Sequence, residues 1–478
     1  MALVLKPARQ PLRGQLQVPG DKSLSHRALL LGAWAHGPTA IAGLLEADDV
    51  RATGAALAAL GVAIDRPAPG HTVVTGGGGR LAQPSAPLDA HNAGTCLRLL
   101  AGLLVAANVP ATLTGDASLR RRPMGRLVAL LAALGGRLSA APDGRAPLHI
   151  ERHGGLCLGA IQLPVPSAQL ASAALLAALG GTGTLILRGL GGARDHTQRM
   201  LRAFGARLEE TDGGDGCRVS GGQPLFGRSL QIAGDPSSAA FWLAAATQIE
   251  GSELALPNVC LNPARLGFLR ILRRMGAAIE VLPAPPDDAF AGEPVGTLVV
   301  RAARLRATTV AAHEVPAVID ELPLLAVLAS GADGVTEVRG AGQLRIKESD
   351  RIDSIGRGLR AMGAHYQPLA DGFRVAGPTP LVGAELAADG DHRIAMALAV
   401  ASASAAGPST LRDAACASIS YPNFWDAWQR ALGHAAAPAG PAAKDAAERP
   451  GELAPVAGRP TRAPAQRPPR GQTPDKGP

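Results

Sequence analysis

The hydrophobic pattern of the chain repeats at a long period. Six times, a helix-like apolar run ends in a hydrophobic-Gly step and a short strand-like segment follows, as in "ALGVAID" and "AFGARLE". These steps lie 70 to 87 residues apart and contain Gly61, Gly135, Gly205, Gly276, Gly363 and Gly433. Glycine at this place supplies the left-handed residue with which many helices end. The pattern therefore predicts six structural units that close in the same way.

Each unit also opens in the same way. Small or polar residues precede an Ala/Leu-rich run that is apolar nearly all round, as in "GDKSLSHRALLLGAW" and "GDPSSAAFWLAAA", and such a run is typical of a buried helix. A β-rich segment such as "GTLILRGL" separates the two helices of a unit. We therefore predict an α/β fold of βαβαβ-like units, three in each of two lobes with a cleft between them.

Length and composition favour several domains and argue against some classes of protein. The 478 residues are 47% hydrophobic, and a chain of this length exceeds one compact domain. No apolar run is long enough to span a membrane and no signal peptide is recognisable, so we expect a cytoplasmic protein that does not bind membranes. The five cysteines lie far apart, without a Cys-x-x-Cys pair or histidines at metal spacing. This predicts buried free thiols, with neither a disulfide framework nor a metal site.

Charge narrows the class of partner. A net charge of +8 favours an anionic partner, but only 3% of the residues are aromatic, which leaves few surfaces on which nucleic-acid bases could stack. Small anionic substrates are therefore expected, and nucleic acid is not. Residues 437–478 are rich in Pro, Ala and Arg and poor in large aliphatic residues, so this segment is predicted to be a disordered tail.

The starts of the apolar helices are the first candidate site. Helix N-termini expose unpaired N–H groups and the positive end of the helix dipole, which suits a phosphate or a carboxylate. Any one of these starts could also be an ordinary N-cap that faces solvent. Together they carry the polar side chains that an anion-binding cleft needs, namely Lys22, Arg27, Arg98, Gln169, Asp320, His392 and Arg393.

Further charge is concentrated in "GDASLRRRPMGRL", "GARDHTQRM" and "LRIKESDR". A single cluster is usually a solvated face, but in the last one we expect Lys347 and Arg351 to lie one helical turn apart with Glu348 between them. Cation and carboxylate would then reach one ligand. Asp320 precedes an apolar helix, where a carboxylate is either an N-cap or a catalytic group. The acid–base candidates are Lys22, Asp320, Glu321 and Glu348.

From Leu5 to Leu432 the chain resembles the 5-enolpyruvylshikimate-3-phosphate (EPSP) synthase family, the 3-phosphoshikimate 1-carboxyvinyltransferases. The matching motifs, in family order, are "PGDKSLSHRALLLGA", "NAGTCLR", "GDASLRRRPMGRL", "PSAQLASAALLAA", "RDHTQRM", "GDPSSAAFWLAAA", "IDELP", "LRIKESDR" and "GDHRIAMALA". The resemblance implies the two-lobed enolpyruvyl transferase fold, with six βαβαββ repeats arranged three plus three around pseudo-threefold axes. It also implies one lobe of residues 21–233 and another of residues 1–20 with 234–436, and it does not cover the tail.

The resemblance implies transfer of the carboxyvinyl group of phosphoenolpyruvate to the 5-hydroxyl of shikimate 3-phosphate in aromatic amino-acid biosynthesis. A tetrahedral intermediate is implied, as is a monomer without cofactor or metal. Asp320 is then the general base, Glu348 the partner in protonating the methylene carbon, and Lys22 a proton shuttle that contacts both substrates. The implied shikimate 3-phosphate contacts are Lys22, Ser23, Arg27, Ser167, Ala168 (through its backbone), Gln169, Arg194, Asp320 and Lys347. Those implied for phosphoenolpyruvate are Lys22, Gly94, Arg122, Gln169, Arg351 and Arg393.

The chain departs from many family members at one position of the implied site. Ile419, in "SISYPNF", stands where those members have a lysine, which puts one phosphoenolpyruvate contact in question. Gly94 is the small residue that in this family usually leaves room for the inhibitor glyphosate. We therefore expect the protein to be a glyphosate target.

Two alternatives remain. UDP-N-acetylglucosamine carboxyvinyltransferases share the fold and the donor, but they carry a cysteine in the loop that corresponds to "GDASLRRRP" and an Asn where this chain has Ser23. A non-catalytic polyanion-binding protein would use the same basic helix starts and would bind nucleic acid with a strong salt dependence. Asp320 and Glu348 count against it, because carboxylates repel a polyanion.

Overall fold

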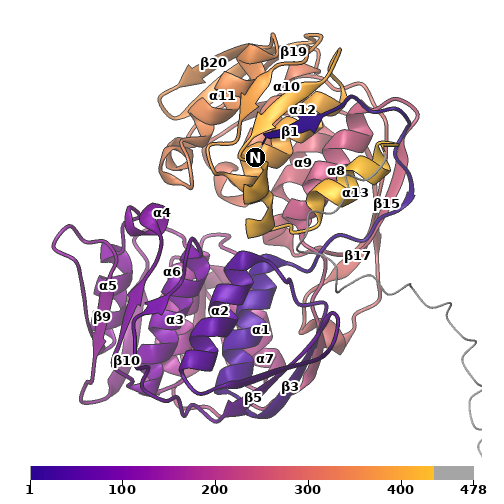
Figure 1. The fold of residues 1–478 in the computed structure, drawn as a ribbon. Coiled ribbons are helices and arrows are strands. Elements are labelled where there is room, and N and C mark those ends of the chain that lie inside the picture. Colours follow the sequence, from indigo (N-terminus) through magenta and orange to yellow (C-terminus); the bar gives the residue numbers. More distant parts are fainter. Residues whose placement is uncertain (1, 435–478) are drawn as a thin grey trace, which may run out of the picture. The chain divides into compact units, whose positions relative to one another are not determined.

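A computed structural model describes residues 2–434 of the chain. Within them the buried hydrophobic side chains form two clusters, one drawn mostly from residues 24–233 and the other from residues 5–18 and 239–432. Each cluster is the core of one lobe (Figure 1). The exact lobe boundaries at residues 20/21 and 233/234 stay a prediction, and the tail at 437–478 lies outside the described residues.

Three four-stranded sheets with their helices build the first lobe. The first sheet joins β14 (Ser229–Gln231), β3 (His36–Ala42), β5 (His71–Gly77) and β4 (Ala63–Ala68), with helices α1 (Lys22–Trp34) and α2 (Asp48–Ala59). The second joins β6 (Leu88–Asp89), β7 (Ala111–Thr114), β9 (Leu148–Glu151) and β8 (Arg137–Ala140), with α3 (Gly94–Ala107), α4 (Ala117–Arg120) and α5 (Gly125–Ala133). The third joins β10 (Leu156–Gln162), β11 (Gly181–Arg188), β13 (Gly216–Ser220) and β12 (Leu208–Thr211), with α6 (Ala168–Ala178) and α7 (His196–Ala203).

The second lobe repeats this plan. Its first sheet joins β2 (Arg13–Gln15), β15 (Glu253–Cys260), β17 (Val295–Arg301) and β16 (Ala278–Pro283), with α8 (Pro236–Gln248) and α9 (Gly267–Arg274). The next joins β18 (Thr309–Val310), β19 (Gly334–Val338), β21 (Gly372–Gly377) and β20 (His365–Leu369), with α10 (Leu322–Ser330) and α11 (Arg351–Ala361). The last joins β22 (Glu385–Ala387), β23 (Ser409–Arg412) and β1 (Ala2–Leu5), with α12 (His392–Ala403) and α13 (Phe424–Ala431).

The sheets share one pattern of strand directions. The first two strands of each sheet are parallel, and the remaining pairs are antiparallel, as β10, β11, β13 and β12 show. In the sixth unit, β1 from the start of the chain pairs with β23 and takes the place of a hairpin. The prediction of six βαβαββ units in two lobes is confirmed, with the sixth sheet reduced to three strands. The strand that we expected after Gly433 falls outside the described residues.

The six repeated glycines end helices, as predicted. All have a positive φ, from 77° at Gly433 to 103° at Gly205. The N–H of each glycine donates to the carbonyl three residues earlier, and the N–H of the next residue donates to the carbonyl five residues before it, as in Val62 to Leu57 and His434 to Gln429. This pair of bonds is the Schellman motif, which needs a left-handed residue.

The two segments on which the lobes meet run antiparallel. Gly20 and Gly234 form a β-bridge. The N–H of Asp21 donates to the carbonyl of Ala233 at 2.7 Å, and the N–H of Asp235 donates to that of Pro19 at 2.9 Å. Helices α1 and α8 begin immediately after these bonds, so the first helix of each lobe is anchored at the same place.

The expected thiol environments are only partly correct. Cys96, Cys217 and Cys260 are buried, whereas Cys157 is exposed and Cys416 half-buried, because Cys157 falls on an outward-facing position of β10. Among residues 2–434, none of the helices has the length and apolar character needed to cross a membrane. The described part of the chain also contains no group of His, Cys, Asp and Glu side chains that could hold a metal ion.

Candidate active site

Gly-Asp pairs fix the starts of α1 and α12, two helices that carry predicted site residues. Oδ1 of Asp21 accepts a 2.8 Å hydrogen bond from the N–H of Leu24, and Oδ1 of Asp391 accepts one of 2.9 Å from the N–H of Arg393. These caps satisfy N–H groups that a helix start leaves free. Lys22 and Arg393 are thereby held in the first turns of α1 and α12.

Lys22 is paired with a carboxylate of its own lobe. Its Nζ lies 2.9 Å from Oδ2 of Asp49, near the start of α2, and the two side chains are 19% and 10% exposed. Asp49 is not predictable from the sequence, because nothing local to it indicates a contact with a residue 27 positions away. The pair holds the ammonium group of Lys22 at the start of the helix.

Arg27 is buried and oriented by hydroxyl groups. Its Nε donates to Oγ1 of Thr197 at 2.7 Å, its Nη2 donates to Oγ of Ser172 at 2.8 Å, and its Nη1 donates to the carbonyl of Ser23 at 2.8 Å. Burial lowers the pKa of Arg27 to about 10. The predicted contacts Ser23 and Arg27 therefore lie together, and Ser172 and Thr197 are additions that the sequence alone did not indicate.

The "SAQ" and "NAGT" motifs meet within the first lobe. Ser167 is the N-cap of α6, and Ala168 and Gln169 are its first two helical residues. Nε2 of Gln169 donates to Oγ1 of Thr95 at 3.0 Å, and Thr95 follows Gly94 at the start of α3. Two helix starts that were predicted separately are thus joined by a direct contact.

Asp320 lies just before α10 and does not cap it, since that helix starts without a capping bond from a side chain. Arg194 of the first lobe instead donates a 2.9 Å hydrogen bond to its Oδ2. Arg351 and Arg393 of the second lobe lie 3.7 and 3.8 Å from the carboxylate. Burial alone would raise the pKa of Asp320, but the surrounding cations, Arg393 first, hold it well below its usual range. The N-cap interpretation is therefore wrong.

The neighbouring Glu321 lies in a different environment. Its Oε1 accepts a hydrogen bond from the hydroxyl of Ser237 at 2.5 Å and lies 3.4 Å from Nη1 of Arg393. Burial, with the charge of Asp320, raises the pKa of Glu321. Two adjacent carboxyl groups therefore have pKa values pushed in opposite directions.

Glu348 is held by arginines of both lobes. Nη2 of Arg351 donates to its Oε2 at 2.6 Å, and Nη2 of Arg122 in the first lobe lies 3.3 Å from its Oε1. Burial opposes ionisation, but Arg351 and Arg122 hold the pKa of Glu348 well below its usual range. The two predicted catalytic carboxylates, Asp320 and Glu348, are each paired with an arginine from the other lobe.

Lys347 is not part of a helix. The short helical segment η5 (Gly342–Ile346) ends before it, and α11 begins at Arg351 with Asp350 as its N-cap. The expectation that Lys347 and Arg351 lie one helical turn apart is therefore wrong, because the cap at Asp350 delays the start of the helix. Burial lowers the pKa of Lys347, against the opposing charge of Asp320.

His392 is the first residue of α12 and is 1% exposed. Neither ring nitrogen has a hydrogen-bond partner within residues 2–434. Burial, together with the charge of Lys22, lowers the pKa of His392 to about 3. The ring is therefore neutral at physiological pH.

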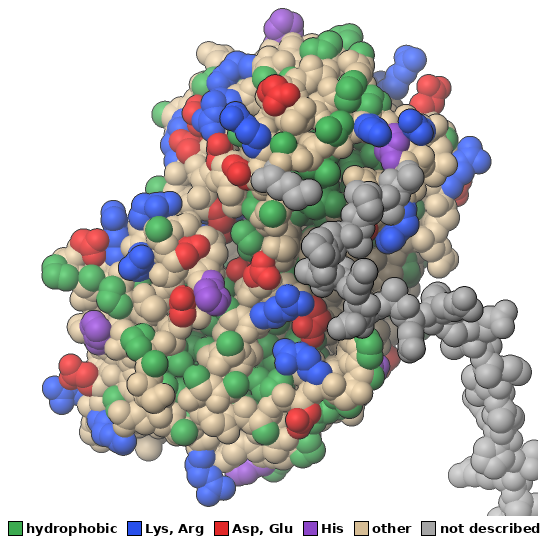
Figure 2. Space-filling model, viewed as in Figure 1, with side chains coloured by type: hydrophobic (Ala, Val, Ile, Leu, Met, Phe, Trp, Pro, Cys, Tyr) green, Lys and Arg blue, Asp and Glu red, His purple; other side chains and the backbone are tan. Residues whose placement is uncertain are grey.

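Ile419 lies in the second lobe, whereas the arginine-rich segment "GDASLRRRPMGRL" lies in the first lobe. Ile419 ends the short segment η6 (Ala414–Ile419), where its neighbour Ser418 donates to Asp48 of α2 at 2.7 Å. Basic side chains gather over α4 in Figure 2, and Arg120 and Arg121 of this segment are exposed. Arg122, in contrast, turns toward Glu348.

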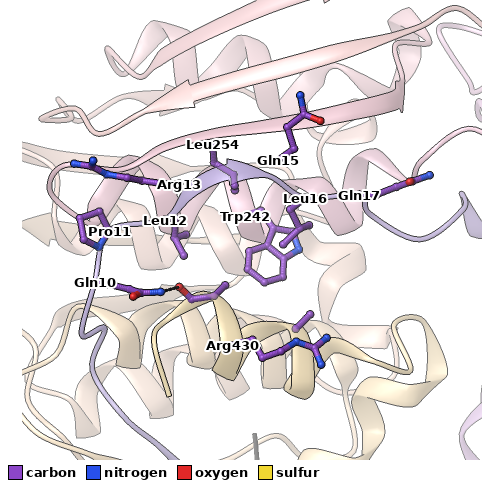
Figure 3. A pocket seen from close by; sticks show the side chains of 12 residues that line it. Gln10, Pro11, Leu12, Arg13, Gln15, Leu16, Gln17, Trp242, Leu254 and Arg430 are labelled. Atoms are coloured by element: carbon purple, nitrogen blue, oxygen red, sulfur yellow. Dashed lines mark hydrogen bonds between the residues drawn. The ribbon is translucent and has the colours of Figure 1, made fainter. Parts of the chain in front are cut away.

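One cavity lies apart from these residues. It has a volume of about 760 Å³ and is formed by residues 10–13 and 15–17, Trp242, Leu254 and the end of α13 (Figure 3). Gln10 donates to the carbonyl of Ala431 at 3.3 Å along one side of it. None of the described residues that line this cavity is an acid or a predicted site residue, so it offers no acid–base pair.

The sequence of the chain matches a known protein family. The family model described as EPSP synthase (3-phosphoshikimate 1-carboxyvinyltransferase) matches residues 7–428. The chain belongs to the EPSP synthase family. The match spans both lobes and every residue of the candidate site, and it argues against the polyanion-binding alternative.

Individual relatives agree with this membership. The chain is 46% identical over 434 residues to the 3-phosphoshikimate 1-carboxyvinyltransferase of Synechococcus sp. (strain JA-3-3Ab), covering 90% of this chain and 96% of the relative. Its fold is similar to that of the EPSP synthase of Acinetobacter baumannii, with a TM-score of 0.80, 36% identity, and 90% and 98% of the two chains covered. The enolpyruvyl transferase NikO of Streptomyces tendae, at 20% identity and a TM-score of 0.72, shares the fold.

Proposed function

We propose that this member of the EPSP synthase family transfers the carboxyvinyl group of phosphoenolpyruvate to the 5-hydroxyl of shikimate 3-phosphate and releases phosphate. The observation that carries the proposal is the pairing of Asp320 with Arg194 and of Glu348 with Arg122 across the lobes. Both substrates carry a phosphate and a carboxylate, so their approach needs cations that offset their repulsion. The site supplies these cations beside two carboxylates that can accept or return a proton.

Both lobes contribute residues to the proposed contacts of each substrate. The first lobe offers the oriented guanidinium of Arg27 and the start of α6, whose free N–H groups suit a phosphate. The second lobe offers Lys347, Arg351 and Arg393. The proposed shikimate 3-phosphate contacts are Lys22, Ser23, Arg27, Ser167, Ala168, Gln169, Arg194, Asp320 and Lys347. The proposed phosphoenolpyruvate contacts are Lys22, Gly94, Arg122, Gln169, Arg351 and Arg393.

The ion pairs imply an exchange when the substrates bind. Arg194 donates to Asp320, and Arg122 lies against Glu348, although both arginines are proposed to hold substrate anions. A bound phosphate or carboxylate can replace the protein carboxylate on each guanidinium, since both are oxyanions that accept from the same donors. The displaced carboxylates are then free to act on the reacting groups.

The chemistry follows from these positions. Lys22 delivers a proton to the methylene carbon of phosphoenolpyruvate, with the carboxylate of Glu348 as its partner, which makes the neighbouring carbon electrophilic. Asp320 accepts the proton of the 5-hydroxyl as it adds. The tetrahedral intermediate then returns a methyl proton to the amine of Lys22 and expels phosphate. A general acid–base group contributes about 10²- to 10⁴-fold, so positioning and the surrounding cations must supply much of the remaining rate enhancement.

The proposal assigns no role to a cofactor or a metal ion. A monomeric state, a cytoplasmic location and the absence of membrane and nucleic-acid partners remain predictions of the sequence. Sensitivity to glyphosate likewise follows from Gly94 as a prediction, and Ile419 leaves one phosphoenolpyruvate contact of other family members in question.

Phosphate release tests the proposal. Purified protein is given phosphoenolpyruvate alone, with shikimate 3-phosphate, or with UDP-N-acetylglucosamine, and a Lys22→Ala variant serves as the control. We expect release only with shikimate 3-phosphate and its loss in the variant. Release with UDP-N-acetylglucosamine instead would move the assignment to the related enzyme. No release from folded protein would contradict the transferase assignment altogether.

A further inference from the structure

Two N-cap aspartates begin the two lobes from the same point. Asp21 caps α1, and Asp235 caps α8 by accepting a 2.8 Å hydrogen bond from the N–H of Ser237. Each aspartate follows a glycine of the bridge between Gly20 and Gly234. The backbone N–H of Lys22 also points to Oδ2 of Asp235, at 3.4 Å. The proposed proton shuttle is thus one residue from the junction of the lobes.

A single arginine joins the two caps. Arg265, in the short helical segment η2 (Pro263–Arg265), places Nη1 2.6 Å from Oδ2 of Asp21 and Nη2 2.8 Å from Oδ1 of Asp235. The same Nη2 donates to the hydroxyl of Ser237 at 3.0 Å. The Arg265 side chain is 3% exposed and that of Asp21 is fully buried.

Burial makes this arrangement selective for arginine. Two carboxylates that are withdrawn from water are tolerated only if a cation and hydrogen bonds satisfy them. The planar guanidinium reaches both aspartates with separate nitrogens, whereas the ammonium of a lysine is a single point of attachment. The position of the Arg265 guanidinium between the caps therefore fixes the distance between the starts of α1 and α8.

The contacts continue into the candidate active site. The hydroxyl of Ser237, which accepts from Arg265, donates to Glu321. Glu321 in turn lies 3.4 Å from Nη1 of Arg393, and the same nitrogen donates to the carbonyl of Asp320 at 3.0 Å. Arg265 is thereby linked to Lys22 through the cap of α1 and to Arg393 through two intermediate side chains.

We propose that Arg265 is a positioning residue of the active site, which joins the two lobe starts and holds Lys22 in register with Asp320 and Arg393. The proposal rests on the proposed function, because it assigns Arg265 a role in that reaction. Arg265 is not among the proposed substrate contacts. It acts only through the caps and through Ser237 and Glu321.

The test uses the full chain and two conservative variants. Arg265→Lys keeps the charge but loses the two-pronged contact, and Asp21→Asn keeps the helix cap, since Asn caps as well as Asp, but loses the charge that faces Arg265. Arg274→Lys is the matched control, because Arg274 on α9 is 42% exposed and ion-paired with Glu314 away from the junction. Circular dichroism gives the Tm of each protein, and kcat and both KM values are measured well below it.

A positioning role predicts a fall in kcat that exceeds any change in KM. We expect kcat to fall about 10- to 100-fold in Arg265→Lys, the loss that a small misplacement of reacting groups produces, and to fall in the same direction in Asp21→Asn. The double variant should be little worse than Arg265→Lys alone, because both changes break one interaction. Arg274→Lys should match the wild type.

The outcomes separate the two proposals. Suppose that the wild type is active and that the variants keep its kcat per folded molecule, even with a lower Tm. This result overturns the positioning role and leaves the proposed function intact. An inactive wild type overturns both. If Arg265→Lys does not fold, Asp21→Asn decides the question, because its cap is preserved.

Discussion

Arg194 of the first lobe donates a 2.9 Å hydrogen bond to Oδ2 of Asp320 in the second lobe. The guanidinium that is proposed to bind shikimate 3-phosphate therefore also holds the proposed base. In the proposed binding mode, a substrate anion that takes over Arg194 would offset positive charge around Asp320, and phosphoenolpyruvate would do the same at Arg351 and Arg393. Because opposite charges lower the pKa of a carboxylate, we expect Asp320 to gain proton affinity when both substrates are bound. Substrate binding would then be coupled to the strength of the proposed base.

Replacing Asp320 with Asn removes the proposed base and keeps the size of the side chain. We expect kcat to fall by about 10²- to 10⁴-fold, the usual contribution of a general acid–base group, while shikimate 3-phosphate still binds. Rapid-quench single turnovers and calorimetry of the binary complex measure the two quantities. Asp353→Asn, at an exposed ion pair of α11, is the control. A kcat close to that of the wild type would exclude Asp320 as the base.

The same substitution should alter stability in a pH-dependent way. The pKa of Asp320 lies well below its ordinary value of 3.8, so its ionised form stabilises the fold above that pH, and the effect is lost as the pH falls. We expect Asp320→Asn to lower the free energy of unfolding by about 1–3 kcal/mol at pH 7. The difference should shrink by about 1.4 kcal/mol per unit below pH 4. Urea unfolding from pH 7 to pH 3 checks this, and a constant difference would contradict it.

Replacing Thr197 with Val should change the KM for one substrate only. Its Oγ1 accepts from Nε of Arg27 and lies 2.7 Å from Oγ of Ser172, so Thr197→Val leaves a buried guanidinium nitrogen unpaired without changing the shape of the site. We expect the KM for shikimate 3-phosphate to rise about 10-fold, as the loss of a hydrogen bond to a charged group predicts. The KM for phosphoenolpyruvate should change little.

Thr197→Ser is the matched variant for this prediction, because it removes a methyl group and keeps the hydroxyl. Its KM for shikimate 3-phosphate should stay near that of the wild type. Equal effects of Val and Ser, or an equal rise in both KM values, would show that Arg27 is not oriented through the hydroxyl of Thr197.

Local signals were sufficient for the frame of the molecule and for naming the candidate site residues at helix starts. Glycines such as Gly61 and Gly363 mark helix ends because a Schellman turn needs a left-handed residue within a few positions of the helix. The cations at helix starts, such as Lys22 and Arg393, were predictable for the same reason, since a helix start depends on neighbouring residues. The spacing of Lys347 and Arg351 fits one helical turn, but Asp350 is an N-cap and α11 begins only after it, at Arg351.

The partners of those cations were not predictable. Asp49 is 27 residues from Lys22, Thr197 is 170 residues from Arg27, and Arg265 is 244 residues from Asp21. Such contacts form only when the units and the lobes assemble, and no periodicity along the chain records them. The environment of Asp320 belongs to this class too, because its shortest ion pair, 2.9 Å, is with Arg194 of the other lobe.

Gly94 is the first residue of α3, and it lies against two arginines. A Cβ at this position would lie 2.7 Å from Nη1 of Arg98 and 3.1 Å from Nη1 of Arg122. Gly94→Ala therefore requires both guanidiniums to move, and Arg122 is a proposed phosphoenolpyruvate contact. We expect the KM for phosphoenolpyruvate to rise about 10-fold, equivalent to about 1.4 kcal/mol of crowding. Inhibition by glyphosate should weaken, and Tm should not fall, because alanine favours a helix more than glycine does.

Gly125→Ala is the control for this crowding effect. Gly125 is also the first residue of its helix, α5, and a Cβ there would meet nothing within 4 Å. Steady-state kinetics should therefore show wild-type KM values for Gly125→Ala and a selective change for phosphoenolpyruvate in Gly94→Ala. If Gly94→Ala raised the KM for shikimate 3-phosphate equally, the methyl group would be disturbing the lobe as a whole. The placement of phosphoenolpyruvate beside Arg122 would then lose its support.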